Sequence, residues 1–331
     1  MIRVCVVGMG RAGKIHAENF LNKIEGARLV GIADPVEPVA KQAGQKLGVP
    51  YWLDYKEALK AKDLDALVIC TPSYVHLEQI VEAARAGKHV LCEKPLVLNS
   101  GEAEEALQAV EKGGVKLQVG YVRRFDKYYS EAKKRIEAGE IGKPLLFKNT
   151  ARDPFLPSGW ITDPSLSGGI FLDMLSHDFD MARWLMGKEV KEVEVRGGAW
   201  LYEEARKKGD QDTVGVLLTF ENEGIGLLEG CRKCAYGYDL RTEVVGSEGV
   251  LMVGSPYDLN LSVGKDEGIT PKKAKWFWER FEKAFLLEDR HFIECIGRDK
   301  EPLVGGIDGK KALEISIASR QSLKEGKPIN L

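Results

Sequence analysis

The chain has 331 residues, of which 44% are hydrophobic and 30% charged, and its formal net charge is −2. This length suits two domains, and the near-neutral charge argues against a nucleic-acid-binding protein, which usually has a strongly basic face. The first residues lack the pattern of a signal peptide, and no apolar run is long enough to span a bilayer, so we expect a cytoplasmic protein.

The first 120 residues alternate short apolar runs with amphipathic segments. Strands alternating with helices are typical of right-handed βαβ units and a parallel sheet covered on both faces. We therefore predict a doubly wound α/β domain of the Rossmann type over residues 1–120. Its predicted strands are Ile2–Val7, Arg28–Ala33, Asp65–Cys70, His89–Cys92 and Lys116–Val119, and its predicted helices are one ending at Ile24, Pro35–Leu47, Val75–Ala86 and Ser100–Gly113.

After Gly120 the pattern changes to successive strands with few helices between them. This order indicates an α+β domain over residues 121–331, with a large, open and mainly antiparallel sheet. The predicted elements are a helix Lys127–Ala138, a strand Pro144–Arg152, a long helix Ile170–Met186, strands between Val190 and Val263 with a turn at Gly254–Pro256, and helices near Ala274–Ile296 and Gly309–Leu323.

A glycine-rich turn follows the first predicted strand. Gly8-Met9-Gly10-Arg11-Ala12-Gly13 matches G-x-G-x-x-G, a string that is weak alone in a chain with 36 glycines. Its position between a buried strand and a helix is more specific. There the first glycine allows the turn, the second lets a pyrophosphate approach, and the third lets the helix pack on the strand. A merely tight strand–helix turn is the alternative.

Asp34 follows the second predicted strand, where this fold places an acid against the adenosine ribose. A carboxylate accepts hydrogen bonds from ribose hydroxyls but repels a 2′-phosphate. The next residue is Pro35 and not an arginine, so NAD is favoured over NADP. Asp34 could also cap the helix that follows, and the two roles are compatible.

Thr71-Pro72 follows the predicted strand Asp65–Cys70 at the edge where open α/β sheets bind ligands. His76, just beyond Pro72, either contacts the cofactor or is a packing or helix-capping residue. His16 is predicted to be structural. All six cysteines are also predicted to be structural. Cys231 and Cys234 are three apart on a predicted strand and would face opposite ways, so we expect no metal site.

Two segments suggest acid–base chemistry. Glu93-Lys94-Pro95 closes the predicted strand His89–Cys92, which puts Lys94 at the cofactor edge of the sheet. On one α-helix, Asp173, His177 and Asp180 would share a face, and an acid beside a histidine can orient it as a general base. A surface Asp–His pair on an amphipathic helix is the alternative.

In this order, the glycine turn, Glu93-Lys94-Pro95 and the Asp173/His177/Asp180 segment resemble the glucose–fructose oxidoreductase and inositol dehydrogenase family over essentially the whole chain. The segments Gln118–Asp126 and Tyr236–Asp239 look most like the inositol 2-dehydrogenases.

The resemblance implies a cis Lys94–Pro95 bond, a homotetramer assembled through the C-terminal sheet, and three groups of site residues. The catalytic set would be Lys94, Asp173 and His177. Cofactor contacts would come from Gly8, Met9, Gly10, Arg11, Ala12, Gly13, Asp34, Thr71, Pro72, His76, Glu93 and Lys94. Substrate contacts would come from Lys94, Arg123, Asp153, Asp173, His177 and one of Tyr236 and Tyr238, which are two apart on a predicted strand; Tyr238 is favoured.

These groups predict that NAD accepts a hydride from a ring hydroxyl of a cyclic polyol, myo-inositol or a related inositol. Lys94 would stabilise alkoxide charge while His177 takes the proton. A dehydrogenase or reductase acting on another sugar is one alternative. A non-catalytic sugar sensor is the other, and the intact Lys94/Asp173/His177 set argues against it.

Overall fold

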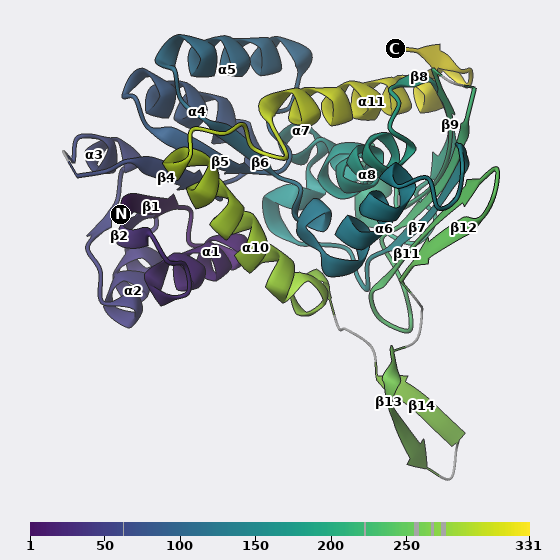
Figure 1. The fold of residues 1–331 in the computed structure, drawn as a ribbon, viewed down its shortest axis with the longest axis horizontal. Coiled ribbons are helices and arrows are strands. Elements are labelled where there is room, and N and C mark those ends of the chain that lie inside the picture. Colours follow the sequence, from purple (N-terminus) through teal and green to yellow (C-terminus); the bar gives the residue numbers. More distant parts are fainter. Residues whose placement is uncertain (62, 222, 255–257, 266–267, 273–275) are drawn as a thin grey trace. The chain divides into compact units, whose positions relative to one another are not determined.

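The computed structural model describes residues 1–61, 63–221, 223–254, 258–265, 268–272 and 276–331. Side chains are described for all of these residues except those within 255–275. The chain forms two compact units (Figure 1). Unit 1 comprises Met1–Phe125 and Lys283–Leu313, and unit 2 comprises Asp126–Glu282 and Glu314–Leu331. Unit 1 thus includes residues 283–313 in addition to the N-terminal segment, whereas the prediction divides the chain once, at residue 120. The end of the predicted turn Gly254–Pro256 and the predicted helix start at Ala274 lie outside the described residues.

Unit 1 contains a parallel sheet of six strands in the order β3-β2-β1-β4-β5-β6. This order is that of a doubly wound dinucleotide-binding fold and confirms the predicted fold class. The shortest strand of this sheet, Tyr51–Trp52, was not predicted, because two residues show no periodicity. The strands are β1 (Ile2–Val7), β2 (Ala27–Ala33), β3 (Tyr51–Trp52), β4 (Ala66–Ile69), β5 (His89–Glu93) and β6 (Leu117–Gly120).

Helices flank this sheet, and their apolar faces build its core. Leu29 of β2 and Phe20 of the first helix lie in one buried cluster with Phe292 and Ile293, which come from the distant helix α10. The last two side chains explain why residues 283–313 belong to unit 1. The helices of the first segment are α1 (Arg11–Asn22), α2 (Glu37–Leu47), α3 (Tyr55–Leu59), α4 (His76–Arg85) and α5 (Ser100–Gly113), with short 3-10 turns η1 (Ser73–Val75) and η2 (Val122–Phe125); α10 spans Phe277–Gly297.

Unit 2 is built on a sheet of seven strands in the order β12-β11-β7-β10-β9-β8-β15. Its pairs are antiparallel except β7–β10, which is parallel, so the sheet is mixed and mainly antiparallel as predicted. β13 and β14 form a separate pair. The strands are β7 (Pro144–Arg152), β8 (Val190–Gly198), β9 (Thr213–Phe220), β10 (Ile225–Cys231), β11 (Asp239–Gly246), β12 (Val250–Val253), β13 (Asp258–Lys265), β14 (Gly268–Lys272) and β15 (Ile329–Asn330).

The predicted single helix Ile170–Met186 is wrong. Ile170–Met174 forms a π-helical turn, η4, in which Leu175 N donates to Ile170 O at 2.9 Å, and α8 begins only at Ser176. Turns of the π-helical type are rare in proteins, and those that occur often lie at functional sites. The other helical segments are α6 (Lys127–Glu137), η3 (Gly159–Thr162), α7 (Pro164–Ser167), α8 (Ser176–Met186), α9 (Glu203–Lys207) and α11 (Gly306–Glu325).

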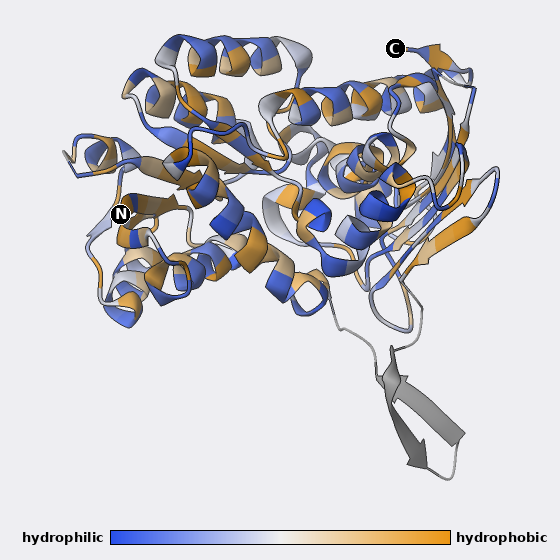
Figure 2. Ribbon diagram, viewed as in Figure 1, coloured by the Kyte–Doolittle hydropathy of each residue, from blue (hydrophilic) through white to orange (hydrophobic). Residues whose placement is uncertain are grey.

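One face of the unit 2 sheet carries exposed apolar side chains. Burial alternates along β7, β9 and β10, where residues such as Phe147, Val216 and Leu228 point into the core. Figure 2 shows β12 as a strongly hydrophobic strand. The exposed members are Leu217, Ile225, Leu227, Val250 and Met252. Within the described residues, no helix combines the length and the apolar character needed to cross a membrane.

Candidate active site

The glycine-rich turn in unit 1 has the geometry that a dinucleotide site requires. Gly8 has φ +87°, and a Cβ there would lie 2.7 Å from Cys70 O. A Cβ on Gly13 would lie 1.8 Å from Gly8 O, so only glycine lets α1 pack this closely. Gly10 is different, because a Cβ there would meet nothing within 4 Å. The first and third glycines are therefore required by packing, and the second faces open space.

Gly10 directly precedes α1 and supplies no side chain to cap its first amide groups. A helix N-terminus of this kind carries partial positive charge and attracts a phosphate. Arg11 is exposed beside Gly10, while Met9 is buried. The residues present thus fit the pyrophosphate of a dinucleotide.

Asp34 lies directly after β2 and braces this turn. Its Oδ2 accepts a hydrogen bond from Met9 N at 2.8 Å, and its Oδ1 accepts one from Val36 N at 2.9 Å. The second bond closes a turn at Val36, the residue directly before α2, but it does not satisfy an amide group of the helix itself. Asp34 therefore fixes the glycine turn in addition to the ribose contact that the sequence predicts.

His76 connects the loops that follow β4 and β5. Its Nδ1 lies 2.8 Å from Pro95 O, and its Nε2 lies 2.9 Å from Thr71 O. Burial lowers the pKa of His76, and the two carbonyl contacts only partly offset that effect. With the ring buried and both nitrogens engaged, the geometry favours the packing alternative over a direct cofactor contact. Thr71 Oγ1 in turn donates to Gln79 Oε1 at 2.7 Å.

Lys94 directly follows β5, and its peptide bond to Pro95 is cis, as the family resemblance implies. Glu93 Oε2 accepts a hydrogen bond from Lys94 N at 3.1 Å. Arg123 is buried in η2 of the same unit. Its neighbour Arg124 is structural, because it donates to Leu303 O and to Asp308 Oδ1.

Asp173 of unit 2 has a partner that the sequence did not reveal. The fully buried Arg232, directly after β10, donates from Nη1 to Asp173 Oδ2 at 3.2 Å, and its Nη2 lies 3.6 Å from Asp210 Oδ2. Asp210 also accepts a hydrogen bond from Ile170 N at 3.0 Å, at the start of the π-helical turn. Arg232 thus ties both carboxylates to η4. No periodicity or motif marks an arginine that sits between Cys231 and Cys234.

The α-helical spacing predicted for Asp173, His177 and Asp180 does not hold across the junction at Leu175. Asp173 lies in η4, whereas His177 and Asp180 lie in α8. Asp180 is fully buried, while Asp173 and His177 are partly exposed. The structure therefore separates Asp180, a core residue, from the two residues predicted to be catalytic.

The tyrosine pair does not lie on a strand, because β11 begins at Asp239 and Tyr236 sits in the preceding turn. The hydroxyl of Tyr236 donates to Asp239 Oδ2 at 2.6 Å and accepts from Arg152 Nη1 at 2.8 Å. Desolvation and the Asp239 carboxylate raise the pKa of Tyr236 to about 12. This hydroxyl is thus engaged by both Asp239 and Arg152.

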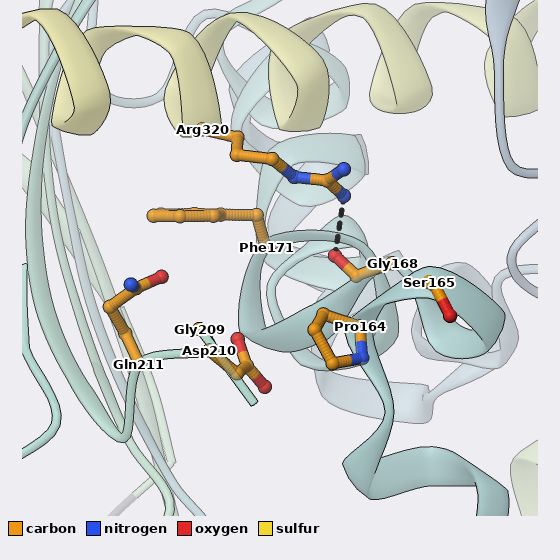
Figure 3. A pocket seen from close by; sticks show the side chains of 8 residues that line it. All are labelled: Pro164, Ser165, Gly168, Phe171, Gly209, Asp210, Gln211 and Arg320. Carbon is orange, nitrogen blue, oxygen red and sulfur yellow. Dashed lines mark hydrogen bonds between the residues drawn. The ribbon is translucent and has the colours of Figure 1, made fainter. Parts of the chain in front are cut away.

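Asp153 continues the β7–β10 pairing beyond β7, since its N donates to Cys231 O at 2.9 Å. A cavity of about 220 Å³ lies elsewhere in unit 2 (Figure 3). It contains none of the predicted site residues, and Arg320 Nη2 donates to Gly168 O beside it. Its residues are Pro164, Ser165, Gly168, Phe171, Gly209, Asp210, Gln211 and Arg320.

Two family models match the chain. The oxidoreductase family, NAD-binding Rossmann fold, matches residues 2–121, and the GFO/IDH/MocA C-terminal domain matches residues 129–252. The scyllo-inositol 2-dehydrogenase (NAD(+)) of Bacillus subtilis (strain 168) is 38% identical over 331 residues, covering 100% of this chain and 96% of the relative. The myo-inositol 2-dehydrogenase of Thermotoga maritima is also 38% identical, over 332 residues, covering 100% and 98%.

Among solved structures, scyllo-inositol dehydrogenase from Lactobacillus casei with bound cofactor NAD(H) and scyllo-inositol superposes with a TM-score of 0.93. It is 32% identical and covers 100% of this chain and 99% of its own. These full-length similarities agree with the glycine turn and with the six-stranded parallel sheet. The chain therefore belongs to the GFO/IDH/MocA family of oxidoreductases and is an NAD-dependent dehydrogenase.

Proposed function

We propose that this dehydrogenase oxidises a ring hydroxyl of an inositol. The observation that carries the proposal is the position of Lys94, directly after β5 at the carboxyl edge of the parallel sheet. The glycine turn and Thr71 follow β1 and β4 at the same edge. Ligands of doubly wound sheets bind outside that edge. The relatives whose names include scyllo- and myo-inositol dehydrogenases support this substrate class.

In the proposed mechanism, Lys94 is the electrostatic partner of the reacting oxygen. Its ammonium group donates a hydrogen bond to the substrate hydroxyl and stabilises the negative charge that develops there. The Gly8–Gly13 turn and Asp34 would hold NAD, which would accept the hydride from the carbon that bears the reacting hydroxyl. The mechanism requires no charge on the substrate, which suits a neutral polyol.

His177 is the proposed general base and takes the hydroxyl proton. Asp173 orients it, and Arg232 in turn fixes the Asp173 carboxylate through the 3.2 Å contact. Arg123, Asp153 and Tyr238 are proposed to bind the remaining hydroxyls.

Replacing the two proton-handling residues tests the proposal. Turnover of a panel of inositol isomers and hexoses is followed by the absorbance of reduced cofactor. His177→Ala should lower kcat about 10²–10⁴-fold, and Lys94→Ala about 10²–10³-fold, with NAD binding largely retained. His89→Ala and Lys112→Ala are the matched controls. If His177→Ala keeps near-wild-type turnover, His177 is structural and the proposed chemistry is wrong.

We also propose that the protein is a homotetramer and that a second copy covers the apolar face formed by Leu217, Leu227, Val250 and Met252. An exposed apolar sheet face of this kind is usually buried by another subunit.

All six cysteines are free thiols, which are typical of a reducing compartment and support the proposed cytoplasmic location.

A further inference from the structure

A chain of buried polar side chains runs through unit 1 to the backbone of Lys94. His16 of α1 stands in its centre. Its Nδ1 lies 2.6 Å from Asp289 Oδ1 of α10, and its Nε2 lies 3.1 Å from Glu93 Oε1 at the end of β5. Glu93 accepts the Lys94 N–H with its other oxygen, at 3.1 Å. The chain thus connects α10, α1 and β5.

Each member of this chain is held in place. His16 and Asp289 are fully buried, and Asn19 Nδ2 donates to Asp289 Oδ2 at 2.8 Å. Phe285 packs against the imidazole edge-to-face, with ring centroids 5.5 Å apart. A Cβ on Gly120 would lie 3.0 Å from Glu93 Oε2, so the glycine leaves room for the carboxylate.

The hydrogen-bonding pattern favours a charged His16, although burial raises the pKa of Asp289 and so works against its ionised form. An ionised carboxylate only accepts hydrogen bonds, so an imidazole between two carboxylates must donate from both nitrogens, as the cation does. Burial by itself lowers the pKa of His16, but the carboxylates of Asp289 and Glu93 outweigh it and raise this pKa well above its usual value.

The groups around His16 agree with one positive charge in this cluster, which the imidazolium carries. Glu288 is fully buried near His16 and Glu93, and no hydrogen-bond partner for either of its carboxyl oxygens lies within the described part of the chain. Desolvation, with the Glu93 charge, raises the pKa of Glu288 well above its usual value, which favours its neutral form. Burial likewise raises the pKa of the nearby thiols Cys70 and Cys92.

We propose that His16 is a positioning residue, a permanent imidazolium that holds Glu93 and thereby fixes the backbone on which Lys94 stands. This inference rests on the proposed function of Lys94 for its effect on turnover, but the charge of His16 does not. A cation bound by His16, Glu93 and Glu288 is the competing interpretation. It would need a lone pair on Nε2, which an imidazolium lacks.

The charge is tested on the wild-type protein, without any activity measurement. The chain has five histidines, so selective ¹⁵N-histidine labelling gives a tractable spectrum, in which His16→Gln assigns the His16 resonances. Both His16 nitrogens should stay protonated from about pH 5 to 9, near the range in which an ordinary histidine titrates. A neutral tautomer within that range overturns the proposal. So does a shift of these resonances on addition of stoichiometric Zn²⁺.

The positioning role is tested by kinetics. His16→Gln and Glu93→Gln should each lower kcat, by on the order of 10²-fold if Lys94 moves by about 1 Å. The double variant should lose no more than the worse single variant, because both break one chain. His89→Gln, at the opposite end of β5, should keep wild-type turnover. Additive losses, or an unchanged kcat in His16→Gln, overturn the positioning role.

The two proposals fail in distinguishable ways. If Lys94→Ala keeps its turnover, the proposed chemistry is wrong, while the ¹⁵N spectrum still reports whether His16 is charged. If Lys94→Ala loses its turnover and His16→Gln does not, the chemistry stands and the positioning role is wrong.

Discussion

Replacing Arg232 by methionine should destabilise unit 2 strongly. The side chain is 0% exposed and contacts Asp173 at 3.2 Å and Asp210 at 3.6 Å. Removing one partner of a buried ion pair typically costs about 3–5 kcal/mol, because the other charge stays behind. Asp210 keeps its bond from Ile170 N, and methionine fills much of the space, so we expect about 3 kcal/mol.

For a unit of this size, roughly 2–4 °C of Tm accompanies each kcal/mol, so Tm should fall by about 6–12 °C. Thermal and urea unfolding followed by circular dichroism measure the change. Arg196→Met is the matched control, because Arg196 is 64% exposed in its pair with Glu194 and should cost about 0–1 kcal/mol. Adding Asp210→Asn to Arg232→Met should recover part of the loss. A cost below about 1 kcal/mol for Arg232→Met would show that Arg232 does not hold these carboxylates.

Three further results are expected. The enzyme should use NAD at least about tenfold better than NADP, or about 1.4 kcal/mol, and Asp34→Ala should narrow the gap; equal wild-type kcat/KM with both cofactors would contradict this. Met252→Asp, on a side chain 71% exposed in β12, should dissociate the proposed tetramer in light scattering, whereas a monomeric wild type would remove its basis. Desolvation raises the pKa of Asp212, but bonds from the Trp200, Leu201 and Tyr202 amides outweigh it and lower this pKa overall. Asp212→Asn should therefore lose urea resistance at pH 7, and the difference from wild type should shrink as pH falls below about 4, through the lowered pKa; a constant difference would contradict the assignment.

The sequence predicted what periodicity and glycine chemistry encode. The strand–turn–helix at Gly8–Gly13 and the parallel sheet are confirmed, because local residues determine both. The π-helical turn at Ile170–Met174 escaped prediction, since its apolar pattern also fits an α-helix. Asp210, which accepts from Ile170 N, is distant in sequence.

Partnerships across long sequence separations were the other omission. Arg232 lies 59 positions from Asp173, and His16 lies 273 positions from Asp289. No spacing rule links such residues, so the sequence predicts only a structural role for His16 and nothing in it marks Arg232. The sequence predicted residue types at the site, whereas the residues that hold them became visible only in the fold.

The return of residues 283–313 to unit 1 has a consequence for the order in which the protein can fold during synthesis. Phe292 and Ile293 belong to the same buried cluster as Phe20 and Leu29. Asp289, which contacts His16, emerges from the ribosome at the same late stage. The nucleotide-binding unit therefore cannot complete its core while only residues 1–125 have been made, whereas Asp126–Glu282 emerges before α10 is complete. The first unit to begin synthesis therefore stays incomplete until residues 283–313 have emerged, and unit 2 waits longer still, for Glu314–Leu331. Until then the unfinished cores expose apolar surface, which favours aggregation.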